Sequence, residues 1–116
     1  MLSVDPASGA PPYEQLRRQV VEQVAAGMLR PGARLPPVRR LAEDLGLAAG
    51  TVARAYRELE AAGVVETRGR AGTVVAPTGD RTEQQAQAAT LAYLAELGRL
   101  GLDGGDALRL VDQLRD

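Results

Sequence analysis

Residues 34–75 read RLPPVRRLAEDLGLAAGTVARAYRELEAAGVVETRGRAGTVV, and their pattern predicts the architecture of the chain. The first part of this stretch places apolar residues at i, i+3, i+4 and i+7, which is the spacing of one face of a short helix. These residues are Val38, Leu41, Ala42 and Leu45. Pro36 comes just before them and Gly46 just after, as is typical of the start and the end of a helix. A helix that ends near Leu45 is therefore predicted.

A second helical pattern follows after only a few residues and is closed by Gly63. Its apolar members are Val52, Ala55, Tyr56, Leu59 and Ala62. Two helices joined by so short a glycine-containing segment must turn sharply, which is typical of a helix-turn-helix. The face of the second helix that turns away from the core carries Gly50, Thr51, Arg54, Arg57 and Glu58. We expect this face to enter the major groove of DNA.

Beyond Gly63 the pattern changes from helical to extended. Two short runs rich in β-branched residues, 64–67 and 73–75, flank a basic loop at 68–72, and this predicts a β-hairpin. The glycines of the loop let its backbone approach a phosphate while its arginines neutralise charge. An ordinary solvated turn is the alternative, but the position behind a helix-turn-helix favours a wing that contacts DNA.

A third helical pattern opens at Pro11-Pro12 and ends near Gly27, and its apolar residues would pack across the other two helices. The turn at 30–33 leads to Arg34-Leu35, a short strand that would join the hairpin. Residues 11–77 are thus predicted to form a winged helix-turn-helix domain, in a fold that is mainly α with a small β-hairpin wing (α+β). Residues 1–10 form an N-terminal arm, for which a small strand, a dimer arm and disorder remain open.

Residues 78–116 begin as a linker and continue as a two-helix C-terminal extension. Helices this apolar cannot stay exposed, and two are too few to form a core alone. They must pack on the winged domain or on a second copy of the chain. We favour the second copy, because a palindromic operator needs two recognition helices about one DNA turn apart. The expected dimerisation residues are Leu91, Leu94, Leu97, Leu108, Val111 and Leu114.

The runs PPYEQLRRQVVEQVAAGMLRPGARLPPVRRLAEDLGL and TVARAYRELEAAGVVETRGRAGTVV resemble the N-terminal domain of the GntR family of bacterial transcription regulators. The similarity covers about residues 11–76 and includes three separate signatures in order, PGxRLPxVRxLA, TVxRAYxELExxG and RGxxGTxV. The short C-terminal extension further resembles the YtrA-like subfamily. This resemblance implies dimerisation through the tail and places transporter genes among the expected targets.

The resemblance also implies roles for individual residues. Arg39 matches a family arginine that contacts DNA, Thr51 matches the threonine of the recognition helix, and Gly69 to Thr73 match the wing. Arg54 is an expected base contact, whereas Arg34 and Arg57 are expected phosphate contacts. The full expected DNA-binding set is Arg34, Arg39, Ala49, Gly50, Thr51, Arg54, Arg57, Gly69, Arg70, Gly72 and Thr73.

The chain departs from the family pattern at the start of the recognition helix. Many members have Ser or Thr followed by Arg there, whereas this chain has Ala48-Ala49-Gly50. A side-chain oxygen that would cap the helix is therefore missing. A candidate guanine-reading arginine is missing as well, so specificity must depend more on Arg39, Thr51, Arg54 and the wing.

Charge and composition agree with this interpretation. The net charge is −1, but residues 13–77 hold ten arginines against seven acids and residues 78–116 hold four against seven, so the positive charge lies in the winged domain. All basic residues are arginines, which suits phosphate binding, although GC-rich coding explains this equally well. The absence of Cys and His excludes thiolate metal sites and imidazole bases.

Three functions are compatible with a chain of this kind to different degrees. The first is a dimeric repressor that binds a palindromic double-stranded DNA operator, with its own operon among the candidate targets, and the alternative is a winged-helix protein-interaction module. An enzyme is the third, but its only candidate groups are scattered carboxylates that fit solvated helix faces. We expect no catalytic residue, cofactor, metal or membrane span, and a cytoplasmic protein. The sequence names no small-molecule effector.

Overall fold

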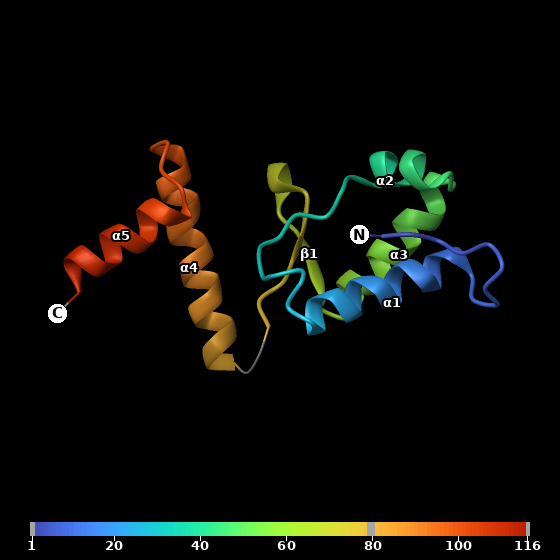
Figure 1. The fold of residues 1–116 in the computed structure, drawn as a ribbon, viewed down its shortest axis with the longest axis horizontal. Coiled ribbons are helices and arrows are strands. Elements are labelled where there is room, and N and C mark those ends of the chain that lie inside the picture. The colour runs from blue at the N-terminus through green and yellow to red at the C-terminus, as the bar shows by residue number, and fades with distance from the viewer. Residues whose placement is uncertain (1, 79–80, 116) are drawn as a thin grey trace. The chain divides into compact units, whose positions relative to one another are not determined.

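A computed structural model describes residues 2–78 and 81–115, and for 81 and 82 it describes the backbone alone. The chain divides into two compact units, Met1–Ala76 and Pro77–Asp116 (Figure 1). The first unit contains α1 (Pro12–Ala25), α2 (Val38–Leu45), α3 (Ala49–Ala61), β1 (Val65–Thr67), the single 3-10 turn η1 (Gly69–Ala71) and β2 (Thr73–Val75). The second unit contains α4 (Arg81–Arg99) and α5 (Gly104–Leu114).

The core of the first unit forms where α1 and α2 pack against α3 (Figure 1). Apolar residues at helical spacing supply it, because that spacing gathers them on one face of each helix. The most deeply buried members are Leu16, Val20, Val52, Ala55, Leu59, Val65 and Val75. This three-helix arrangement with a two-stranded antiparallel hairpin confirms the predicted winged helix-turn-helix.

The hairpin pairs Val65 with Val75 and Thr67 with Thr73. The expected third strand is present only as a single β-bridge between Arg34 and Val74. Two backbone hydrogen bonds flank this bridge, from the Leu35 N–H to the Thr73 carbonyl at 2.9 Å and from the Val75 N–H to the Ala33 carbonyl at 2.8 Å. The loop before α2 is therefore fastened along the hairpin.

The N-terminal segment lies along α1 in an extended conformation. Ser3 and Gln19 exchange two hydrogen bonds, of 2.9 Å and 2.7 Å, and the Asp5 N–H donates to Gln15 Oε1 at 2.8 Å. Leu2 and Val4 pack against the core. The structure thus assigns no strand to residues 2–5 and shows an extended segment fastened to α1.

In the second unit, α4 and α5 contact each other and bury Leu97 and Ala107. Asp103 caps α5: its side chain accepts from the Asp106 N–H at 3.0 Å, and the Asp106 side chain accepts from the Asp103 N–H at 3.0 Å. The hydrogen bond from the Asp103 backbone is the main cause that lowers the pKa of Asp106. No helix in the described ranges is long and apolar enough to cross a membrane.

Two details differ from the sequence-based expectations. Ala62 is exposed and is not part of the core, because α3 ends at Ala61 and Ala62 is its C-cap. The sequence has a glycine, Gly98, where the first tail helix is expected to end, but this helix continues to Arg99. Gly101 makes the turn instead, with φ +81°, since a left-handed backbone conformation is readily adopted by glycine.

Candidate nucleic-acid interface

The turn between α2 and α3 is built on Gly46, whose φ of 67° is left-handed. The next residue, Leu47, donates its N–H back to the Ala42 carbonyl at 2.9 Å and so closes the end of α2. Ala48 is the N-cap of α3 and forms no side-chain capping hydrogen bond. The missing cap predicted from the sequence is thereby confirmed, and the exposed residues Ala49 and Gly50 form the first turn of the helix.

Tyr56 joins the middle of α3 to the start of α2. Its ring is buried with 7% exposure, and its hydroxyl donates to the Pro36 carbonyl at 2.6 Å. Burial raises the pKa of Tyr56 to about 12, so the hydroxyl keeps its proton and remains a donor. This contact fixes the segment that leads into α2, the helix that carries Arg39.

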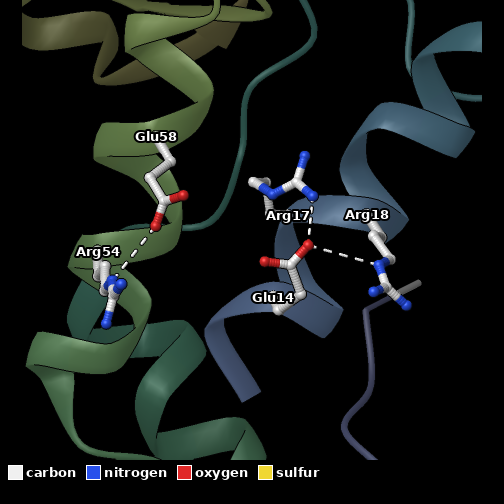
Figure 2. A network of polar contacts seen from close by, with 5 residues as sticks. All are labelled: Glu14, Arg17, Arg18, Arg54 and Glu58. Carbon is white, nitrogen blue, oxygen red and sulfur yellow. Dashed lines mark hydrogen bonds and ion pairs between the residues drawn. The ribbon is translucent and has the colours of Figure 1, made fainter. Parts of the chain in front are cut away.

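The two exposed arginines of α3 differ in their contacts. Arg57 forms no ion pair with any described residue. Arg54 donates from Nε to Glu58 Oε2 at 3.2 Å, as Figure 2 shows, and its guanidinium carbon lies 3.7 Å from the centroid of the Tyr13 ring. Thr51 is half-buried at the start of the same helix.

The wing is held by one contact at its base and another at its tip. At its base, the Thr67 hydroxyl donates to Glu60 Oε2 at 2.6 Å, which ties β1 to α3. At its tip, Arg34 Nη2 donates to the Arg70 carbonyl at 3.1 Å. Gly72 has φ +75°, and a Cβ there would lie 3.7 Å from Arg34 Nε. The loop expected at 68–72 is therefore a defined turn, which includes η1.

The wing arginines are not equivalent. Arg68 is paired with Glu66, and its N–H donates to the Gly72 carbonyl at 2.8 Å. Arg70 is exposed and its guanidinium forms no ion pair in the part of the chain that the structure describes. Of the two, Arg70 has the side chain that is available to an external anion.

The recognition helix and the wing share one surface. A hollow of about 200 Å³ opens between them, and residues from α2, α3 and both strands line it: Val38, Ala53, Tyr56, Arg57, Glu60, Thr67 and Thr73. The structure therefore brings Arg57 of α3 together with Thr73 of the wing. Arg34 is directed to the wing backbone, a positioning contact that the sequence did not reveal.

Three further contacts of this surface were not predicted, those made by Tyr13, Glu58 and Glu60. Glu58 stands one helical turn after Arg54, and that i,i+4 spacing could have indicated the ion pair. The contact of Tyr13 joins α1 to α3, which are distant in sequence, and that of Glu60 joins α3 to the following strand β1 across seven residues; neither follows from spacing within one element. Among the described residues, no group of three or more His, Cys, Asp or Glu side chains could hold a metal.

The residues expected to form the dimerisation surface are divided by the structure. Leu97 is buried, and Leu91 and Leu94 are half-buried. By contrast, Leu108, Val111 and Leu114 are exposed on α5, by 75%, 54% and 80%. The exposed members are spaced at i, i+3 and i+6, which places them along one side of the helix.

A helix pair joined by a glycine turn, followed by a hairpin with a basic tip, defines the winged helix-turn-helix class. The chain belongs to the bacterial regulatory proteins of the gntR family, whose model matches residues 12–75. It is 50% identical over 115 residues to the HTH-type transcriptional regulator Rv1152 of Mycobacterium tuberculosis, across 99% of this chain and 94% of that protein. Identity to the HTH-type transcriptional repressor YtrA of Bacillus subtilis is 42% over 83 residues, which cover 71% of this chain and 63% of YtrA.

Solved structures confirm the fold class. YtrA from Sulfolobus acidocaldarius, described as a GntR-family transcription factor, aligns over 99% of this chain and 100% of its own with a TM-score of 0.64 and 26% identity. The DNA-binding domain of AraR, solved in complex with operator ORX1, aligns over 65% of this chain and 93% of its own with a TM-score of 0.56 and 25% identity. The resemblance to GntR regulators with a YtrA-like tail is therefore confirmed.

Proposed function

We propose that this protein is a homodimeric transcription regulator that represses its target genes by binding a two-fold symmetric DNA operator. The family membership and the repressor name of B. subtilis YtrA support regulation and repression. The AraR domain, which was solved on an operator, supports DNA as the partner. The protein acts without catalysis and, as a regulator of bacterial genes, in the cytoplasm.

The observation that carries this proposal is the distribution of unpaired arginines in the first unit. Ion pairs occupy five arginines: Glu14 pairs with Arg17 and Arg18, Asp44 with Arg40, Glu58 with Arg54, and Glu66 with Arg68. In the described part of the chain, no ion pair involves the other five arginines of this unit, and three of these five belong to the helix-turn-helix and the hairpin: Arg39 of α2, Arg57 of α3 and Arg70 of the wing. All three are exposed and lie on the elements that face DNA in a winged helix.

Unpaired guanidinium groups of this kind match phosphate oxygens in geometry and charge. Phosphate contacts fix the register of the protein on the duplex, while base contacts give specificity. Arg39, Thr51 and Arg54 are the proposed sources of base contacts, because Ala49 and Gly50 present no side-chain donor at the start of α3. Gly69, Arg70, Gly72 and Thr73 are proposed to contact the backbone of the DNA.

The exposed side of α5 supports the homodimer. Leu108, Val111 and Leu114 are more than half exposed, and a helix with an apolar side needs a partner surface. Two copies of this side can pack on each other about a two-fold axis, which is the usual symmetry of soluble dimers. Such a dimer would carry two recognition helices to the two halves of one operator.

The dimer can be tested by sedimentation of two variants that add the same charge to α5. Val111→Asp places a carboxylate within the apolar side, whereas Gln113→Asp places it two residues further on, away from that side. We expect Val111→Asp to sediment as a monomer and Gln113→Asp to remain a dimer. A dimeric Val111→Asp protein would remove this side of α5 from the interface.

DNA binding is tested by a mobility shift on the duplex that precedes the gene of this protein, with random duplex as competitor and at two salt concentrations. A nuclease footprint on the same duplex shows which bases the protein protects. Resistance to the competitor and two-fold symmetric protection of the duplex would support an operator-binding dimer. Equal affinity for random duplex would favour the protein-interaction module, for which the side-chain-poor start of α3 at Ala48-Ala49-Gly50 is the specific observation.

A further inference from the structure

The Tyr13 ring supports the guanidinium of Arg54. Tyr13 stands in the first turn of α1 and is half-buried, packed against the core of the winged unit. Arg54 comes from α3, and its Cζ lies 3.7 Å from the ring centroid, well within the distance at which a cation is attracted to an aromatic face. A ring fixed by the core is a rigid platform for the long arginine side chain.

The remaining contacts of Arg54 leave its outer donors unused. Glu58 accepts from Nε at 3.2 Å, and no described residue accepts from the two terminal nitrogens. The Arg54 side chain is 56% exposed. Because stacking uses the face of the guanidinium and not its edge, Nη1 and Nη2 can donate to a ligand while the ring contact persists.

Glu14, which follows Tyr13 in the chain, does not form an ion pair with Arg54. Glu14 is bound by Arg17 and also by Arg18 at 3.5 Å, as Figure 2 shows. The hydrogen bond from Arg17 holds the pKa of Glu14 below its ordinary value, against a smaller opposing effect of burial, so this carboxylate stays ionised and occupied. Glu58 is therefore the one carboxylate bonded to Arg54 in the described residues.

We propose that Tyr13 is a positioning residue for DNA binding, which holds Arg54 so that its terminal nitrogens are presented to the operator. An unrestrained arginine loses much side-chain entropy when it binds, and a side chain already held in its bound position loses less. The inference rests on the proposed function and extends the DNA-binding machinery to α1. Tyr13 does not itself touch the DNA in this proposal.

A double-mutant cycle on operator affinity tests the coupling. Tyr13→Leu removes the aromatic face, Tyr13→Phe keeps it, and Arg54→Ala removes the cation. We expect Tyr13→Leu to weaken operator binding by about two- to fivefold, the range that a cation–π contact at an exposed site supplies. Tyr13→Phe should bind as the unchanged protein does. In the Arg54→Ala background, Tyr13→Leu should have no further effect.

Two readouts separate positioning from a general loss of structure. A purely structural role of Tyr13 would weaken binding by the same factor with and without Arg54, and that result would overturn the proposal. NMR of the free protein provides a second readout, because the ring should shift the Arg54 side-chain protons upfield in the unchanged protein and in the Tyr13→Phe variant, but not in Tyr13→Leu. Unshifted protons in the unchanged protein would also overturn it.

Failure of the proposed function would be recognised separately. If the unchanged protein does not prefer its operator over random duplex, DNA recognition itself fails and the role of Tyr13 in it fails too. If the unchanged protein prefers the operator but Tyr13→Leu binds equally well, the positioning role alone is overturned.

Discussion

The guanidinium of Arg34 donates a hydrogen bond to the backbone carbonyl of Arg70 across 36 residues of sequence, at 3.1 Å. The backbone of Arg34 is itself fixed, because it forms a β-bridge with Val74. The loop before α2 therefore holds the tip of the wing at a defined position. Arg34, which the sequence predicted as a phosphate contact, has its guanidinium on the wing backbone.

Replacing Arg34 should disorder the wing tip and weaken DNA binding. We expect Arg34→Ala to weaken operator binding by about fivefold, which corresponds to about 1 kcal/mol for one lost hydrogen bond. Arg30→Ala is the matched control, since it removes the same charge from an exposed position in the same loop. Fluorescence anisotropy on labelled operator measures both. Equal losses in the two variants would show that Arg34 acts only through its charge.

A serine at the N-cap of α3 should stabilise the protein. Ala48 has the extended conformation of an N-cap, φ −67° and ψ 143°, but lacks a side-chain acceptor for the first helical N–H groups. We expect Ala48→Ser to raise the free energy of unfolding by about 0.5 to 1 kcal/mol, measured by thermal or denaturant unfolding. Ala49→Ser, one residue inside the helix, is the control and should give no such gain. An unchanged or lower melting midpoint for Ala48→Ser would argue against this cap.

The sequence predicted the helices and the hairpin because their signals are local. Helical spacing in α2 and α3, Gly46 between them and the β-branched residues of the wing each depend on neighbours in the chain. The contacts that position the site depend on the packed fold instead. Arg34 meets Arg70, and Tyr13 meets Arg54, only once α1, α3 and the hairpin are assembled.

The apolar residues of the tail also show that local sequence patterns do not predict contacts in the packed fold. Spacing alone assigned Leu97 and Leu108 to one dimerisation surface. In the structure Leu97 is buried while Leu108 is 75% exposed, because α4 and α5 pack on each other through one side of each helix. Periodicity identifies an apolar face but does not say which partner covers it.

The stability of the winged unit should decrease with pH above 10 because of Tyr56. Its pKa is raised from 10.0 to about 12 in the folded protein. The unfolded chain therefore loses this proton first, and the stabilisation, complete below pH 10, is lost as the pH rises to about 12. The loss attributable to Tyr56 is about 3 kcal/mol over this interval.

Denaturant unfolding of the unchanged protein and of Tyr56→Phe at several pH values between 9 and 12 measures this effect. The variant should be less stable by about 1 kcal/mol at pH 9, since the Pro36 carbonyl loses its donor. Its stability should then decrease less steeply with pH, so that the two curves approach and cross. Parallel curves would show that the Tyr56 hydroxyl is not held in its neutral form by the fold.

Two arginines of the wing allow the effect of a direct phosphate contact on DNA binding to be distinguished from the effect of the protein's net charge. Arg68 is paired with Glu66, whereas the guanidinium of Arg70 has no acidic partner in the described ranges. Arg68→Ala and Arg70→Ala change the net charge equally, so both alter long-range attraction to DNA to a similar extent. Only the loss of Arg70 should remove a contact in which an arginine displaces a counterion from a DNA phosphate.

We therefore expect Arg70→Ala to weaken binding to operator and to random duplex alike, and to lower the slope of log affinity against log salt by about 0.9 for each bound subunit. Arg68→Ala should keep the slope, because its guanidinium is already neutralised by Glu66. Affinities measured by anisotropy at four or more salt concentrations give both slopes. Equal slopes for the two variants would mean that the wing attracts DNA only through its total charge, and that Arg70 has no phosphate of its own.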